Sequence, residues 1–189
     1  MNTRGEHDDG NQRAELCPTH PCVVGRVSAA GSLGQRTIRR LREELFIWLI
    51  TVDTTGTPHT LPVGFLWDEA HSTFLIYSAS EADRDRLAHI QQNPKVGLHF
   101  NFDLSGADSF ILTGEASVST DDPSSDQIPA WVEKYQVFFS QMGLTMQQAA
   151  EVAPVALRVR PLTMIVSSWT RGAMLNLKTP EADDDKEDA

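Results

Sequence analysis

The pattern of hydrophobic and polar residues in the first half of the chain predicts three consecutive strands. Residues 46–52 are apolar almost throughout, which favours a strand covered on both faces. Residues 59–68 alternate along their length, and residues 73–78 form a third apolar run. Gly56 and Pro58 lie in the first connection, where a chain reversal requires unusual backbone angles. A second short connection follows, so the stretch predicts an antiparallel meander.

The middle strand has one bulky face and one nearly bare face, because its side chains alternate between the two faces. The bulky face carries Leu61, Val63, Phe65 and Trp67. The opposite face carries Pro62 and Gly64. Proline donates no hydrogen bond to a neighbouring strand and glycine has no side chain, so a flat ligand has room to lie close to this backbone. An edge strand with a bulge gives the same pattern, and the spacing leaves both interpretations open.

The rest of the chain predicts helices placed around three further strands. Helices are predicted at residues 35–45, about 81–93, 129–143 and 145–152, from apolar spacing and capping-box patterns. Strands are predicted at residues 95–101, 109–120 and 155–168. Gly114 and Pro161 mark expected bends in the last two of these strands. Six strands joined mostly by short turns predict a mainly β fold with flanking helices, whose antiparallel sheet closes into a barrel.

One aromatic stripe, on the predicted helix at residues 129–143, has two interpretations. It consists of Trp131, Tyr135, Phe138 and Met142. Aromatic residues at this spacing usually pack in a core or a subunit interface, and a ligand contact by Tyr135 is the less common alternative.

Length and charge predict a single domain flanked by two polar tails. The chain has 189 residues, which favours one domain over two. We expect residues 1–34 to be a disordered extension, residues 35–169 to form the domain, and residues 170–189 to be a disordered acidic tail. Most of the net charge of −10 lies near the two ends of the chain, with −2 in residues 1–15 and −5 in residues 181–189, which argues against non-specific binding to nucleic acids or anionic membranes. No membrane span or secretory leader is evident, so a cytoplasmic location is expected.

The sequence predicts no metal site and identifies no catalytic side chain. Cys17 and Cys22 lack a second pair of ligands at similar spacing, so they are interpreted as incidental residues of the extension. The histidines show no metal-ligand spacing and suit surface or core positions. No nucleophile, phosphate-binding loop or dinucleotide fingerprint is present.

The junction after the third strand is the best candidate for an anion site. The hydroxyl groups of Ser78 and Ser80 can donate hydrogen bonds to an anion there. Either Arg84 or Arg86 can supply a positive charge at the start of a helix. Residues two apart do not share a helix face, so we expect one arginine to face the site and favour Arg86. The alternative is a capped surface helix in which neighbouring aspartates neutralise both arginines.

Six stretches, taken in order and spacing, resemble a known family. They are residues 46–52, 56–58, 61–68, 86–96, 113–116 and 130–135. The chain resembles the pyridoxamine 5'-phosphate oxidase-like family, whose fold is the split β-barrel that binds flavin mononucleotide (FMN). More narrowly, it is similar to the actinobacterial branch of deazaflavin oxidoreductases that use coenzyme F-420. The resemblance covers about residues 38–169 and neither tail.

The resemblance implies a six-stranded antiparallel split β-barrel, a homodimer with the cofactor at the subunit interface, and a small-molecule substrate. The implied reaction is hydride transfer from the reduced deazaflavin to an unsaturated organic acceptor. By the same resemblance, each site residue has a role. Pro62 and Val63 would back the ring, Tyr77 and Ser78 would approach the phosphate-bearing side chain, Arg86 would bind the phosphate with Arg84 nearby, and Trp169 would close the pocket from the partner subunit.

The chain also departs from the flavin-using members of that family. Those proteins carry consecutive basic residues at the junction, whereas Asp85 separates Arg84 from Arg86 here. Their arginine on the second strand is missing too. These departures favour coenzyme F-420 over FMN. An FMN-dependent enzyme and a non-enzymatic protein that binds a flavin, haem or another tetrapyrrole are the alternatives. The acceptor and the source of the proton are not predicted.

Overall fold

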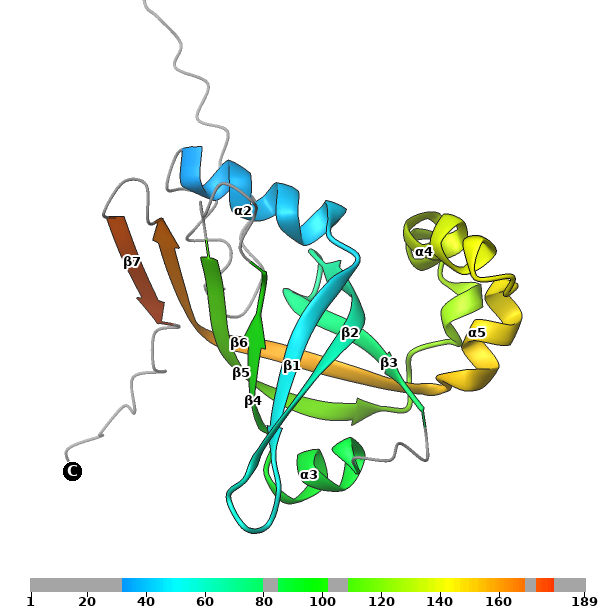
Figure 1. Cartoon of the computed structure of the whole chain (residues 1–189), viewed down its shortest axis with the longest axis horizontal. Coiled ribbons are helices and arrows are strands. Elements are labelled where there is room, and N and C mark those ends of the chain that lie inside the picture. Colours follow the sequence, from blue (N-terminus) through cyan, green and yellow to red (C-terminus); the bar gives the residue numbers. More distant parts are fainter. Residues whose placement is uncertain (1–31, 80–84, 102–108, 169–172, 179–189) are drawn as a thin grey trace, which may run out of the picture.

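The computed structural model describes residues 32–79, 85–101, 109–168 and 173–178, and Figure 1 shows their arrangement. The helices are α2 (Ser32–Glu43), α3 (Arg86–Gln92), α4 (Pro129–Gln141) and α5 (Met146–Val152), with a 3-10 turn η1 (Ser125–Gln127). The strands are β1 (Phe46–Val52), β2 (Pro58–Asp68), β3 (Thr73–Ser78), β4 (Lys95–His99), β5 (Ser109–Ser119), β6 (Val155–Ser168) and β7 (Ala173–Lys178).

The strands form one antiparallel sheet that closes into a barrel. Their order is β3-β2-β1-β4-β5-β6-β7, and β3 also pairs with β6, which closes a ring of six strands. The strand β7 extends the sheet beyond β6. In Figure 1, α2 lies above the barrel, α3 lies below it beside the β1–β2 hairpin, and α4 and α5 lie to the right. The predicted six-stranded antiparallel barrel with flanking helices is confirmed.

The strand β2 belongs to both halves of the barrel. Residues 58–64 pair with β1, and residues 65–68 pair with β3. Its inward side chains Val63, Phe65 and Trp67 are buried in the core. The neighbouring strand β1 alternates between buried and partly exposed positions, although its sequence predicted cover on both faces. That prediction was wrong, because Phe46 on the outer face is 39% exposed.

A bulge bends the long strands where the sequence predicted it. Thr113 pairs with Thr163, but the next residue, Gly114, pairs with Pro161, so β6 contributes one extra residue. A Cβ atom on Gly114 would lie 2.6 Å from the backbone oxygen of Arg160. The close approach of the two strands therefore requires glycine here, and the expected bend is confirmed.

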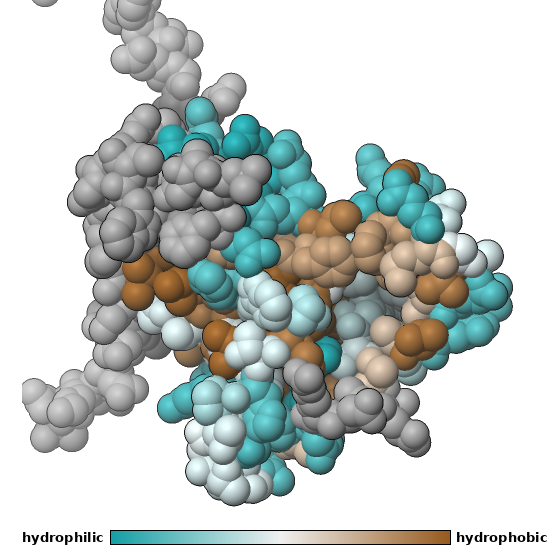
Figure 2. Space-filling model, viewed as in Figure 1, coloured by the Kyte–Doolittle hydropathy of each residue, from teal (hydrophilic) through white to brown (hydrophobic). Residues whose placement is uncertain are grey.

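Two hydrophobic clusters hold the fold together. The larger one fills the barrel. The smaller one lies between the barrel and α4, and its buried members are Leu75, Tyr77, Trp131, Tyr135 and Ala156. Trp131 and Tyr135 thus confirm the core interpretation of the aromatic stripe, whereas Met142 is exposed. Apolar residues also reach the surface between the end of α2 and α4 (Figure 2), where the rings of Phe46 and Phe138 meet edge to face.

Several predicted boundaries need correction. Residues 173–178 form β7, so the acidic tail is not disordered throughout as expected. The helix α2 begins at Ser32, inside the predicted extension, and ends at Glu43. The helix predicted at 81–93 begins at Arg86, and residues 81–84 lie outside the described part of the chain. In the described residues, no helix combines the length and apolar character needed to span a membrane.

Candidate functional site

The structure brings Ser78 and Arg86 together across the junction between β3 and α3. Ser78 is the last residue of β3 and is 1% exposed. Arg86 is the first residue of α3, and its Nη1 donates a hydrogen bond to the Ser78 hydroxyl oxygen at 3.2 Å. These two side chains are the part of the predicted anion site that the structure assembles.

The side chain of Arg86 is half-buried, and one of its guanidinium nitrogens lacks a partner among the described residues. Its Nε atom is buried and has no hydrogen-bond partner in the described part of the chain. Burial lowers the pKa of Arg86. Desolvating a charged donor without a partner is costly, and an anion that accepts from the free N–H would remove that cost. The Arg86 and Ser78 side chains therefore fit the phosphate group of a cofactor.

The start of α3 adds little to this site. The helix has seven residues, and its N-cap, Asp85, makes no side-chain capping bond. Asp85 lies in the left-handed region at φ 44°, a conformation that aspartate tolerates better than most residues. The predicted capping box at residues 80–83 lies outside the described residues. An anion at this junction would thus be held by the Arg86 side chain rather than by a helix dipole.

Tyr77 lies in the cluster beneath α4 and not beside Arg86. Its ring meets Trp131 edge to face with centroids 4.8 Å apart, and its hydroxyl donates to the backbone oxygen of Pro123. Burial, followed by the charge of Asp122, raises the pKa of Tyr77 to about 12. Successive residues of a strand point to opposite faces, so Tyr77 and Ser78 diverge. The Tyr77 hydroxyl is already committed to the loop before η1.

Pro62 and Val63 lie on opposite faces of β2. Val63 is 5% exposed and belongs to the barrel core, so only its backbone is available to a ligand on the outer face. Pro62 is exposed there, in the half of β2 that pairs with β1 alone. The predicted bare face ends at Gly64, where a Cβ atom would lie 3.1 Å from the Tyr135 hydroxyl oxygen. The expectation that Gly64 is bare was wrong, because α4 covers it with Tyr135.

Two predicted site residues, Arg84 and Trp169, lie outside the described residues.

A pair of histidines that their spacing in the sequence did not reveal lies below the barrel. The rings of His59 and His89 are in contact with centroids 4.7 Å apart. The pairing of β1 with β2 places His59 opposite Thr51. That pairing could have located His59, but not His89. No group of three possible metal ligands occurs among the described residues.

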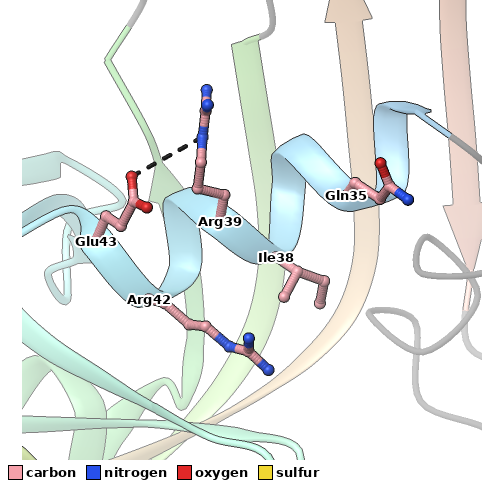
Figure 3. A pocket seen from close by; sticks show the side chains of 5 residues that line it. All are labelled: Gln35, Ile38, Arg39, Arg42 and Glu43. Carbon is pink, nitrogen blue, oxygen red and sulfur yellow. Dashed lines mark ion pairs between the residues drawn. The ribbon is translucent and has the colours of Figure 1, made fainter.

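A groove of about 340 Å³ lies along α2, and Figure 3 shows its lining. It is lined by Gln35, Ile38, Arg39, Arg42 and Glu43. Arg39 and Glu43 form an exposed ion pair at 3.9 Å, and Arg42 pairs with Glu69. The helix α2, which lines this groove, lies on the opposite side of the barrel from α3 (Figure 1). Because its charges already pair with each other, it adds nothing to the site at Arg86.

The sequence model of pyridoxamine 5'-phosphate oxidase matches residues 35–161, which is more than half of the chain. The chain belongs to the pyridoxamine 5'-phosphate oxidase family. This family binds flavin-type cofactors and includes oxidoreductases. No curated protein matches the sequence.

Solved structures share this fold at low identity. A Clostridium acetobutylicum protein of the pyridoxinephosphate oxidase family, related to general stress protein 26, has a TM-score of 0.55 and 14% identity, covering 76% of this chain and 92% of its own. A Listeria innocua pyridoxamine 5'-phosphate oxidase homologue has a TM-score of 0.51 and 20% identity, with 70% and 95% covered. An F-420 reductase has a TM-score of 0.51 and 20% identity, with 67% and 93% covered. These likenesses show the fold alone.

Proposed function

We propose that this protein is an oxidoreductase that transfers a hydride from reduced coenzyme F-420, a deazaflavin, to an unsaturated organic acceptor. The observation that carries the proposal is the half-buried Arg86 side chain, whose buried Nε has no partner among the described residues while Nη1 contacts Ser78. Such a group suits the phosphate of a flavin-type cofactor. The sequence resemblance to the deazaflavin branch and the fold shared with an F-420 reductase support the choice of cofactor.

The charge of the site favours the deazaflavin over FMN. FMN ends in a phosphate monoester, which carries about −1.5 to −2 charges at neutral pH. Coenzyme F-420 carries a phosphodiester instead, with a single negative charge. The described residues of the junction supply one guanidinium and one neutral hydroxyl, and the residue before Arg86 is the exposed Asp85. The single positive charge of these described residues balances the diester better than the monoester.

In this proposal each residue has a limited task. Arg86 and Ser78 hold the phosphate, while Pro62 and the backbone of Val63 lie against the ring on the outer face of β2. The deazaflavin, when bound, supplies the hydride chemistry. The protein orients the cofactor and the acceptor and excludes water between them. Two copies of the chain form the enzyme, with the cofactor at their interface and Trp169 of the partner subunit closing the pocket.

Fluorescence titration of coenzyme F-420 with the purified protein tests the proposal. We expect binding at micromolar concentration and a 10- to 100-fold weaker affinity for Arg86→Ala, on the order of 1.5–3 kcal/mol for a charge-assisted contact. Arg39→Ala is the matched control, because it removes an exposed arginine from the helix on the other side of the barrel. Its affinity should equal that of the wild type.

Two other outcomes would replace the proposal. A yellow protein that retains FMN and ignores F-420 would make it an FMN-dependent enzyme of the same family. Tight binding of a flavin or tetrapyrrole with no turnover under any electron donor would make it a binding protein. A panel of unsaturated acceptors, assayed with reduced F-420, then identifies the substrate class.

A further inference from the structure

The helix α3 packs against the lower end of the barrel through His89. This side chain is 9% exposed, and its Nδ1 lies 3.1 Å from the hydroxyl oxygen of Thr51, near the end of β1. The next residue, Ile90, is buried in the barrel core. The helix is only seven residues long, so its position depends on tertiary contacts such as these and on Leu87, which also packs against the core.

His59 extends this contact to the β1–β2 hairpin. Its ring lies against that of His89, with centroids 4.7 Å apart and planes at 38°. Its Nε2 lies 2.9 Å from Asp53 Oδ2. The other oxygen of Asp53 accepts hydrogen bonds from the backbone N–H groups of Thr55 and Thr57, at 2.8 and 2.9 Å. The His59–His89 pair therefore connects α3 to a turn that is itself fixed by hydrogen bonds.

Arg86 is held more weakly than His89. The two residues are three positions apart on α3, so their side chains lie on neighbouring parts of the same face. Arg86 makes one hydrogen bond of 3.2 Å to Ser78, and its Nε has no partner among the described residues. The residue before it, Asp85, does not cap the helix through its side chain. The position of the guanidinium thus depends on contacts made further along α3.

We propose that His59 and His89 are positioning residues for the anion site, and that their contact fixes α3 so that Arg86 Nε points to the bound phosphate. The identity of that phosphate rests on the proposed function. Neither histidine touches the ligand in this arrangement. Loss of the ring contact leaves the Arg86 side chain itself unchanged. It allows α3 to move, and this movement carries Arg86 away from Ser78.

A double-mutant cycle with coenzyme F-420 as the probe tests this dependence. We expect His59→Ala to weaken F-420 binding about 5- to 10-fold in the wild-type background and to have no effect in the Arg86→Ala background. An equal loss in both backgrounds would overturn the inference, because a general loss of stability acts whether or not Arg86 is present. His59→Phe, which keeps a ring against His89, should recover at least about half of the lost binding free energy. Failure to recover it also counts against the proposal.

Hydrogen exchange at the amides of α3 separates this inference from the proposed function, since it requires no cofactor. The amide N–H groups of His89 and Asn93 bond to the backbone oxygens of Asp85 and His89 at 2.9 and 2.7 Å. His59→Ala should accelerate their exchange by about tenfold or more. Thr51→Val, which removes the hydroxyl bonded to His89, is the second variant and should act in the same direction.

The outcomes are distinct. If neither F-420 nor FMN binds the wild-type protein, the proposed function fails, and faster exchange in both variants still supports the role of the ring contact. If F-420 binds and Arg86→Ala weakens it, while His59→Ala changes neither affinity nor exchange, the proposed function stands and the inference is wrong.

Discussion

Two buried polar groups, the Tyr135 hydroxyl and the Arg86 Nε, lie at two places on the barrel and differ in how completely they are hydrogen-bonded. Tyr135, on α4, is 1% exposed, and its hydroxyl lies 2.6 Å from the N–H nitrogen of Phe65 and 2.6 Å from the backbone oxygen of Leu45. Arg86, on α3, has a buried Nε with no partner among the described residues. The fold uses both the donor and the acceptor capacity of the phenol, whereas the described residues leave one N–H of the guanidinium unpaired.

The difference separates a structural group from a binding group. A buried hydroxyl that accepts one bond and donates another stabilises the folded state, and burial raises the pKa of Tyr135 so that it keeps its proton. A buried cation without a full set of partners destabilises the folded state until a ligand supplies them. If Arg86 binds the phosphate as proposed, local stability and ligand binding are opposed there, and they are unrelated at Tyr135.

Tyr135→Phe should have the largest effect on stability. The substitution keeps the ring in its cluster but leaves the N–H of Phe65 without its hydroxyl acceptor. We expect a loss of about 2–4 kcal/mol in the free energy of unfolding, measured by urea denaturation. Tyr77→Phe is the matched control from the same cluster, since its hydroxyl bonds to one oxygen of an exposed loop residue, Pro123. Equal losses in the two variants would contradict the distinction.

Lys134→Met should have an intermediate effect that depends on pH. Its Nζ lies 3.8 Å from the centroid of the Phe65 ring and 3.4 Å from the backbone oxygen of Leu41, and burial lowers the pKa of Lys134 to about 8. The pKa of an unfolded lysine is about 10.4. Between these values the unfolded chain binds more protons, so wild-type stability should rise as the pH rises from about 8 to 10.4.

Burying the charged amine of Lys134 costs stability, and methionine has no charge to bury at any pH. We expect Lys134→Met to raise the free energy of unfolding by about 2 kcal/mol near neutral pH and to flatten the rise between about pH 8 and 10.4. The measurement is a series of urea denaturations across that range. Lys95→Met, which replaces an exposed lysine of β4, keeps Lys134 and should retain the rise. Unchanged pH dependence in Lys134→Met would show that the buried amine is well solvated.

Much of the fold follows from local sequence signals. The bounds of β1, β3 and β6 agree with the predicted ones to the residue, because alternation and turn residues act over a few positions. The bend at Gly114 and Pro161 followed from the same kind of signal. The contact of Arg86 with Ser78 was also within reach, since the two residues are 8 positions apart across one junction.

Contacts between distant segments could not be predicted in this way. Alternation along β2 shows that Gly64 and Pro62 share a face, but not that Tyr135, about 70 residues later, covers one of them. The contact of His59 with His89 likewise requires the hairpin and α3 to meet at the lower end of the barrel. The strand β7 was missed because residues 173–178 are followed by an acidic run whose composition suggested disorder.

Arg86→Met should have the smallest effect on stability and should sharpen the comparison most. Methionine keeps much of the apolar stem and removes the desolvated charge, so we expect no loss, or a gain of up to about 1 kcal/mol, in the free energy of unfolding. Binding of F-420 should weaken in the same variant by about as much as in Arg86→Ala, 10- to 100-fold. Arg158→Met is the control, because Arg158 is paired with Asp68 at 2.6 Å and also with Asp122.

Removing Arg158 leaves two partly buried carboxylates without their cation, so its loss should cost about 2–3 kcal/mol. The two arginine substitutions thus have opposite expected effects on stability for one reason: Arg158 pairs with carboxylates, whereas Arg86 pairs with none among the described residues. A loss above about 1 kcal/mol for Arg86→Met would mean that the fold itself satisfies this guanidinium. The phosphate would then be held elsewhere, because a group that the protein already satisfies gains little from an anion.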